Sequence, residues 1–150
     1  MRFLILIFIG IFGASSATMA QDAPPFVPIP AQDVTLDEFT WNARPVLLFA
    51  GHPQDPQILR QLELLAEQWP ALAERDVVVI VDTDPNSESD ARLQIRPHGF
   101  MMVLLSKDGK VAQRKPHPWS ARELIRAIDK MPLRIQEEKE RRFLNPRPIE

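Results

Sequence analysis

The sequence of 150 residues contains no cysteine. Thiol-disulfide exchange requires one thiolate that attacks and a second sulfur that resolves the mixed disulfide. Thiol-disulfide oxidoreductase and thiol peroxidase activities are therefore excluded by composition. Without disulfides the fold must be held together by packing alone, for which an apolar content of 45% is sufficient.

Glycine is also scarce, with five residues in the whole chain. Only Gly51, Gly99 and Gly109 lie beyond the first twenty residues. A Walker loop or a G-x-G-x-x-G turn needs several closely spaced glycines to bring backbone up to a phosphate, so both nucleotide-binding motifs are excluded. The nucleophile elbow G-x-S-x-G is absent as well. The sequence therefore assigns neither a cofactor nor a catalytic residue.

The chain has no excess of basic residues. Its formal net charge is −2, and removal of residues 1–20 would take away Arg2 and no acidic residue. This balance gives no electrostatic reason to expect binding to nucleic acid or to an anionic membrane. We therefore expect the partner to be an unidentified protein or a small ligand.

The first twenty residues have the composition of an export signal. Arg2 precedes an apolar run over residues 3–9, and small residues follow up to Ala20. Cleavage after Ala20 is favoured, with 15–17 as an alternative site. Because the apolar run is shorter than the roughly 20 residues that cross a bilayer, an uncleaved anchor is disfavoured. We predict a signal peptide at 1–20 and a periplasmic or secreted mature protein without a stable membrane anchor.

The rest of the chain is predicted to divide into three segments. Residues 21–33 contain four prolines, which suit neither a ladder nor a helix, so they are predicted to be a Pro-rich linker. Residues 34–134 have the length of one compact domain. Residues 135–150 are predicted to be a charged C-terminal helix and tail.

The tail carries charges at helical spacing. Glu137 with Arg141 and Glu138 with Arg142 are favourable i,i+4 pairs on a helix. An exposed, solvated tail is favoured, and a short docking peptide is the alternative.

Three patterns predict the secondary structure of the domain. Unbroken apolar runs indicate strands covered on both faces, an apolar stripe indicates a helix, and Lys107-Asp108-Gly109 indicates a hairpin turn. Phe39 and Trp41 are expected to lie over the sheet. In chain order we expect a short helix at 35–41, a strand at 45–50, a helix at 56–70, strands at 77–81, 100–105 and 111–114, and a helix at 121–131.

The order β-α-β followed by β-β-α is the minimal thioredoxin-like topology, an α/β fold with a central mixed sheet and flanking helices. The chain departs from thioredoxins in two places. Residues 51–56, Gly-His-Pro-Gln-Asp-Pro, stand where the C-x-x-C pair would be, and Met101 stands at the position of the cis-proline. The predicted domain therefore lacks both the CxxC pair and the cis-Pro clamp.

Four separated segments resemble one exported family. They are Phe39-x-Trp41-x-x-Arg44-x-Val46-Leu47-Leu48-Phe49-Ala50, Glu74-Arg75-Asp76-Val77-Val78-Val79, Leu105-x-Lys107-Asp108-Gly109 and Ile128-Asp129-x-Met131-Pro132-x-Arg134. Over residues 36–138 the chain resembles an exported domain-of-unknown-function family, whose domain also ends the animal sushi-repeat-containing extracellular proteins. The resemblance implies a thioredoxin-like fold and an exported location, and it brings no assigned catalytic residues.

Polar residues follow or precede three of the predicted strands at one pole of the sheet. Ligands of α/β sheets gather at the carboxyl ends of strands, so this pole is a candidate ligand site. Two histidines and two aspartates could hold a divalent metal or act as acid and base. Helix capping, a turn and solvated loops are the favoured alternative, and no metal is assigned. The candidate residues are His52, Asp55, Asp82, Asp84, Arg96 and His98.

Charged residues that carry the family resemblance are expected at the opposite pole. A salt-bridge network that fixes strand ends is favoured over a binding surface, and each exposed pair contributes on the order of 0 to 1 kcal/mol. The residues are Arg44, Arg75, Asp76, Lys107, Asp108, Asp129 and Arg134.

These patterns lead to three functional hypotheses. The favoured one is an exported, non-redox thioredoxin-like module that binds a protein or ligand. The second is a metal- or ligand-dependent enzyme that uses His52, Asp82, Asp84 and His98. The third is an envelope or extracellular adhesion or stress accessory, which follows only from the extracellular relatives.

Overall fold

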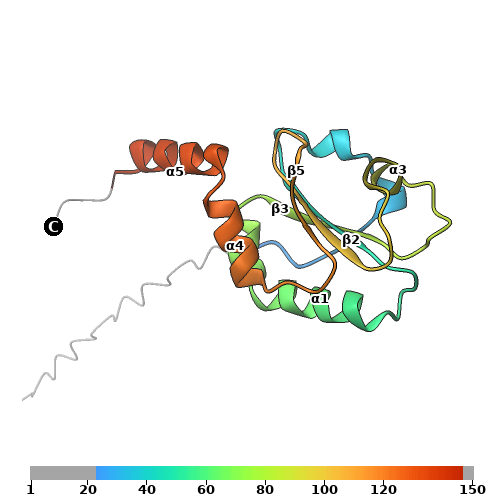
Figure 1. The fold of residues 1–150 in the computed structure, drawn as a ribbon. Coiled ribbons are helices and arrows are strands. Elements are labelled where there is room, and N and C mark those ends of the chain that lie inside the picture. The colour runs from blue at the N-terminus through green and yellow to red at the C-terminus, as the bar shows by residue number, and fades with distance from the viewer. Residues whose placement is uncertain (1–22, 147–150) are drawn as a thin grey trace, which may run out of the picture.

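The computed structural model describes residues 23–146, so the predicted signal peptide lies outside the described residues. Its centre is a mixed five-stranded sheet in the spatial order β1-β3-β2-β4-β5 (Figure 1). The first three strands of this order are parallel, and β4 and β5 run antiparallel to their neighbours. The strands are β1 Ile29–Pro30, β2 Arg44–Phe49, β3 Val77–Asp82, β4 Met101–Leu105 and β5 Val111–Lys115.

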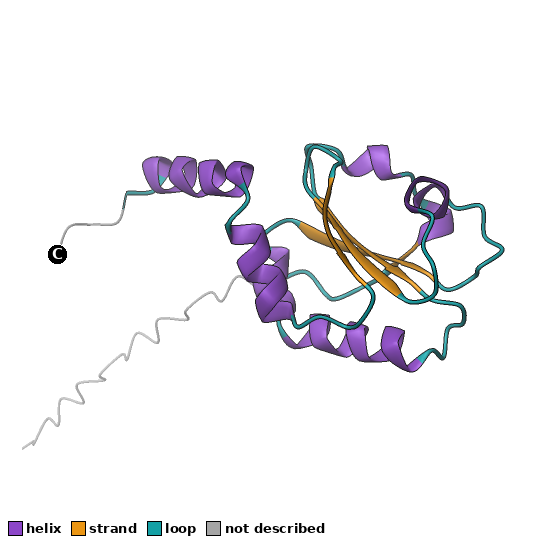
Figure 2. Cartoon of the chain, viewed as in Figure 1, coloured by secondary structure: helices purple, strands orange, loops and turns teal. Residues whose placement is uncertain are grey.

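Helices cover both faces of the sheet (Figure 2). Helices α1, α2 and α4 pack on one face, and α3 with two 3-10 turns packs on the other. Helix α5 projects away from the sheet (Figure 1). The helices are η1 Ala31–Asp33, η2 Leu36–Phe39, α1 Pro56–Glu67, α2 Trp69–Ala73, α3 Asp90–Ile95, α4 Ala121–Asp129 and α5 Pro132–Leu144. Among residues 23–146, no helix is long and apolar enough to cross a membrane.

The unbroken apolar runs are explained by this layering. Successive strand residues point to opposite faces, so Val46 and Leu48 enter the core under α1 and α4. Leu47 and Phe49 enter the second core, under α3. The predicted strands, their order and the thioredoxin-like α/β class are confirmed.

The predicted helix at 56–70 is two helices. Asp55 caps α1 by accepting a 2.8 Å hydrogen bond from the backbone N–H of Gln57, and α1 ends at Glu67. Pro70 has no backbone N–H with which to continue α1, so it stands instead near the start of α2. The short α2 places Leu72 in the core, where it is fully buried.

The segment predicted to be a linker is part of the domain. Phe26 packs against Trp69 with ring centroids 5.0 Å apart and ring planes tilted by 58°, and the Trp69 Nε1–H donates to the carbonyl of Pro24 at 2.7 Å. Ile29 pairs with Ile80 in the sheet. Proline is tolerated here because β1 is an edge strand, so Pro30 need not donate to a second neighbour.

The turn after η2 also differs from the prediction. A capping box opens η2, in which the Thr35 N–H donates to Glu38 at 2.8 Å. The helix ends at Phe39, which packs against the core. Trp41 follows in a left-handed conformation with φ of 67°, and 66% of the residue is exposed. The prediction that Trp41 covers the sheet is therefore wrong.

Candidate functional site

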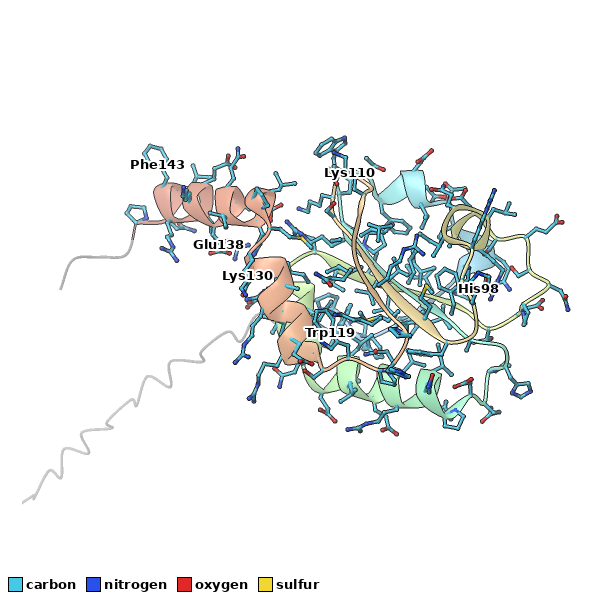
Figure 3. All side chains as sticks on the ribbon, viewed as in Figure 1. His98, Lys110, Trp119, Lys130, Glu138 and Phe143 are labelled. Carbon is cyan, nitrogen blue, oxygen red and sulfur yellow. The ribbon has the colours of Figure 1, made fainter. Side chains whose placement is uncertain are left out.

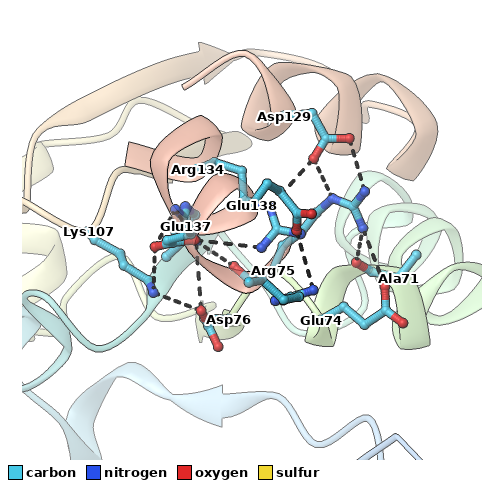
Figure 4. Close-up of polar contacts among 11 residues, drawn as sticks. Ala71, Glu74, Arg75, Asp76, Lys107, Asp129, Arg134, Glu137 and Glu138 are labelled. Atoms are coloured by element: carbon cyan, nitrogen blue, oxygen red, sulfur yellow. Dashed lines mark hydrogen bonds and ion pairs between the residues drawn. The ribbon is translucent and has the colours of Figure 1, made fainter. Parts of the chain in front are cut away.

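The most concentrated polar structure in the described residues surrounds Arg44, at the start of β2. Figure 4 shows members of this cluster, including Asp76, Lys107 and Glu137. The Arg44 side chain is fully buried. Its Nη2 donates to both oxygens of Glu137 at 3.0 Å, and its Nη1 donates to the Arg75 carbonyl at 2.9 Å. A buried guanidinium needs a carboxylate of this kind, because an unpaired buried charge is costly.

Lys107 joins the same cluster from the β4–β5 hairpin. Its Nζ lies 2.7 Å from Asp76 and 2.8 Å from Glu137. Burial favours the neutral amine, but hydrogen bonds to Asp76 and Glu137 outweigh it and raise the Lys107 pKa. Burial likewise opposes ionisation of Glu137, and hydrogen bonds from Lys107 and Arg44 outweigh it and lower the Glu137 pKa.

A second part of the cluster ties the end of α4 and the start of α5 to the segment that follows α2. The Arg75 guanidinium donates to both oxygens of Asp129, at 2.7 and 2.9 Å. This bond raises the Arg75 pKa against the opposing effect of burial. Arg134, 3% exposed, lies 2.5 Å from Glu138 and 3.6 Å from Glu137.

Each of the seven charged residues expected at this pole lies in an ion pair. Six of them share one connected cluster, whereas Asp108 stays in the hairpin, where it accepts from Ser106 and pairs with Lys110 at 3.4 Å. The Asp108 pKa is lowered, chiefly by the Ser106 hydrogen bond. We call the connected cluster the Arg44 network; its members are Arg44, Arg75, Asp76, Lys107, Asp129, Arg134, Glu137 and Glu138.

The predicted boundary at residue 134 is therefore misplaced. Glu137 faces the domain, and its predicted pair with Arg141 does not form; Arg141 instead pairs with Glu138 at 3.3 Å. The i,i+4 pattern suggested that the charged residues of the helix pair with one another. The sequence therefore did not indicate that Glu137 and Glu138 contact the domain. One feature of the sequence did point to such a contact. Arg44 adjoins an apolar run, so its charge can be expected to be buried and to need an acidic partner from elsewhere in the chain.

A groove of about 350 Å³ adjoins the network. One wall comes from the η2–β2 turn and the hairpin, and the other comes from the junction between α4 and α5. We call it the Trp41 groove; it is lined by Trp41, Arg44, Ser106, Lys107, Asp108, Ala112, Met131, Pro132 and Leu133. The Trp41 N–H donates to the Lys107 carbonyl at 2.6 Å, which fastens the turn to the hairpin.

Asp82, a member of the predicted ligand pole, is committed to internal contacts. It is 1% exposed and accepts hydrogen bonds from Ser89 at 2.6 Å and from Arg92 at 2.9 and 3.1 Å. Burial opposes its ionisation, but these bonds outweigh it and lower the Asp82 pKa. Asp82 therefore anchors α3 to β3 and is closed to a ligand.

The other residues of that pole serve local structure. Asp84 accepts from the Asn86 N–H at 2.9 Å, and the His52 Nδ1 accepts from the Gln54 N–H at 3.0 Å. Arg96 ends α3 with φ of 52°. His98 is exposed and lies at the end of the domain opposite α5 (Figure 3).

Across residues 23–146, the structure gathers no set of three His, Asp or Glu side chains that could hold a metal ion. The hypothesis of a metal enzyme built on His52, Asp82, Asp84 and His98 therefore has no geometric support, because Asp82 is enclosed and the others serve local turns or face solvent.

Fold and site together define a cysteine-free thioredoxin-like domain whose polar groups are concentrated at the pole of the Arg44 network. The chain belongs to the family of the domain of unknown function DUF4174, whose model matches residues 35–137. It is similar to a solved structure of Plasmodium yoelii Prx1a, a peroxiredoxin modified at its N-terminus, with 17% identity and a TM-score of 0.50 over 71% of this chain and 81% of that chain. Identity at this level shows the fold alone. No curated protein matches the chain.

Proposed function

We propose that the protein is an exported, non-redox binding module that holds an apolar part of a partner protein in the Trp41 groove. The observation that carries the proposal is Trp41 itself. A bulky residue with positive φ is an outlier that costs about 1 to 3 kcal/mol and persists only where the surroundings enforce it. Here the strained residue is also 66% exposed, beside a groove.

The chemistry of the groove indicates what it binds. Tryptophan is one of the three side chains enriched at the energetic hot spots of protein interfaces. Met131, Pro132 and Leu133 give the groove an apolar wall, and Lys107 and Asp108 give it a polar rim. Its volume of about 350 Å³ is at the low end for small-molecule sites, so an apolar side chain of a protein suits it better than a large ligand.

The Arg44 network gives the groove a fixed shape. Lys107 lies in the hairpin wall of the groove and forms an ion pair with Glu137 on α5. The first residues of α5 form part of the opposite wall. Two walls that come from distant parts of the sequence are thereby tied together. A preformed groove loses less conformational entropy on binding than a flexible one.

The binding proposal is tested by selecting decapeptides from a random display library on the mature protein, residues 21–150. We expect selected peptides to bind Trp41→Asn at least tenfold more weakly. Asparagine tolerates the left-handed conformation, so the turn is kept while the aromatic ring is removed. Leu93→Asn, at a site 60% exposed on α3, is the matched control and should bind normally. Equal binding by both variants would refute the Trp41 groove as the site.

The export part of the proposal rests on the composition of residues 1–20. It is tested by fusing the full chain to a reporter enzyme that is active only outside the cytoplasm, and by measuring the mass of the exported product. We expect activity, a mature terminus at Gln21, and loss of both in Leu6→Arg. An inactive fusion, or an exported chain that retains residues 1–20, would contradict cleavable export.

A further inference from the structure

We propose that the edge strand β5 pairs with an extended acidic segment of a partner protein, which adds a sixth strand to the sheet. This inference rests on the proposed function, because it names the partner of the binding module. Strand addition supplies affinity through main-chain hydrogen bonds and specificity through alternate side chains.

The first observation is that β5 is an open edge. It ends the strand order, with β4 on one side and no further strand of the described sheet on the other. Three of its five residues are exposed, including Val111 at 42%. The outward backbone N–H and C=O groups of such an edge are available for pairing.

The second observation is the sign of the charge. The chain as a whole has a net charge of −2, yet the surface of β5 and the neighbouring face of α4 is basic. Lys110 is 83% exposed beside Asp108. Within the described residues, three further cations of this surface form no ion pair: Lys115, Arg126 and Lys130. We call Lys110 and these three residues the basic strip.

The third observation is that hollows flank β5 on the α4 side. At the hairpin end, Ala112 reaches the Trp41 groove. At the other end, a hollow of about 400 Å³ lies between β5 and α4 and is lined by Gln113, Lys115, Trp119, Glu123, Arg126, Ala127 and Lys130. Figure 3 labels Lys110 at the hairpin and Trp119 and Lys130 beside α4. A paired strand would direct every second side chain to this face.

Charge selects the occupant. Two copies of this chain that met at β5 would bring two basic strips together, which disfavours self-pairing. An acidic strand instead places carboxylates opposite unpaired cations, so electrostatics favours it over a neutral or basic segment.

The test uses three decapeptide libraries in which every second position is fixed as glutamate, serine or lysine. We expect the mature protein to retain the glutamate library at least tenfold more than the lysine library. Recovered peptides should slow amide hydrogen exchange in Val111–Lys115. The double variant Lys110→Glu/Lys115→Glu should bind them at least tenfold more weakly, whereas Arg122→Glu, an exposed charge reversal on α4 away from the strip, should bind normally.

Each other outcome is decisive. Equal retention of the three libraries, unchanged exchange in β5, or equal binding by the double variant and Arg122→Glu overturns the proposed strand addition. If binding then still depends on Trp41, the binding module stands and only the acidic edge partner is wrong. If no library is retained and the random selection also fails, both proposals fall. Dimers that protect β5 without peptide would identify a second copy as the occupant and overturn the inference.

Discussion

The carboxylate of Glu137 accepts two 3.0 Å hydrogen bonds from the Arg44 guanidinium, 93 residues earlier in the chain. Arg44 is fully buried at the start of β2, whereas Glu137 lies in the second turn of the projecting helix α5. The only carboxylate that touches the guanidinium at hydrogen-bond distance among the described residues therefore comes from a helix most of whose residues are exposed. The beginning of α5 belongs to the folded domain.

Glu137→Gln should lower the free energy of unfolding by about 2 kcal/mol, because it removes the charge that neutralises a buried arginine. Urea unfolding of the mature protein measures the change. Glu140→Gln is the matched control on the same helix, since Glu140 is exposed and accepts only from Gln136. Equal midpoints for the two variants would show that Glu137 does not stabilise the domain.

Shortening α5 should have a sharp threshold. A chain that ends at Glu140 keeps the Arg44–Glu137 bonds and loses only exposed residues of the described helix, so its stability should change by at most about 0.5 kcal/mol. A chain that ends at Leu133 loses Arg134 and Glu137 and should be destabilised by at least about 2 kcal/mol. A gradual loss over both truncations, measured by thermal unfolding, would contradict this threshold.

Stability should fall in acid through Glu137 and Asp82. The pKa of each is lower in the folded protein than its ordinary value. Such a carboxyl stabilises the fold above its unfolded pKa, and that stabilisation is lost as pH falls through the folded pKa. We expect a decline that begins near the ordinary glutamate pKa of 4.5 and is less steep in Glu137→Gln. Urea midpoints at a series of pH values would show it; identical profiles would remove Glu137 as a cause.

The raised Lys107 pKa makes stability fall at alkaline rather than acidic pH. Lys107 stabilises the fold fully below its ordinary pKa of 10.5, and this contribution is lost as pH rises through the higher folded value. The alkaline decline in stability should therefore be shallower in Lys107→Met than in the wild type, when each is followed by circular dichroism between pH 9 and 12.

Trp41→Asn should not destabilise the protein and should raise the free energy of unfolding by up to about 1 kcal/mol, because asparagine adopts positive φ with less strain. Leu93→Asn, in the regular helix α3, should give no such gain. A stabilised variant that binds less well would show that the strain at Trp41 serves binding. A large loss of stability in Trp41→Asn would show that the ring is structural.

Phe26→Ala should lower the free energy of unfolding by about 2 kcal/mol, because Phe26 packs on the core and against the tilted ring of Trp69. Val27→Ala is the neighbouring control, at a residue 67% exposed, and should cost less than about 0.5 kcal/mol. If the two variants had equal effects on the urea midpoint, the proline-rich segment would not stabilise the domain and would be a linker.

The local elements of the fold were predictable because each is encoded over a short span. Asp55 and Pro56 start α1, the Ser120 hydroxyl accepts from the Glu123 N–H to cap α4, and Gly109 takes the positive φ of the hairpin. The apolar runs of β2 and β3 indicate strands that are covered on both faces. Given these elements, the connection rules leave few topologies other than the one observed.

The sequence by itself determined the absence of thiol chemistry, the order of the elements and the thioredoxin-like class, since composition and periodicity are local properties. Only the tertiary structure decided which charges meet. Glu137 satisfies Arg44 rather than Arg141, Asp82 is enclosed by α3, Ile29 pairs with Ile80, and Trp41 turns to solvent. Each outcome depends on contacts between residues far apart in sequence, or on how a turn meets them, and local spacing carries no information about such contacts.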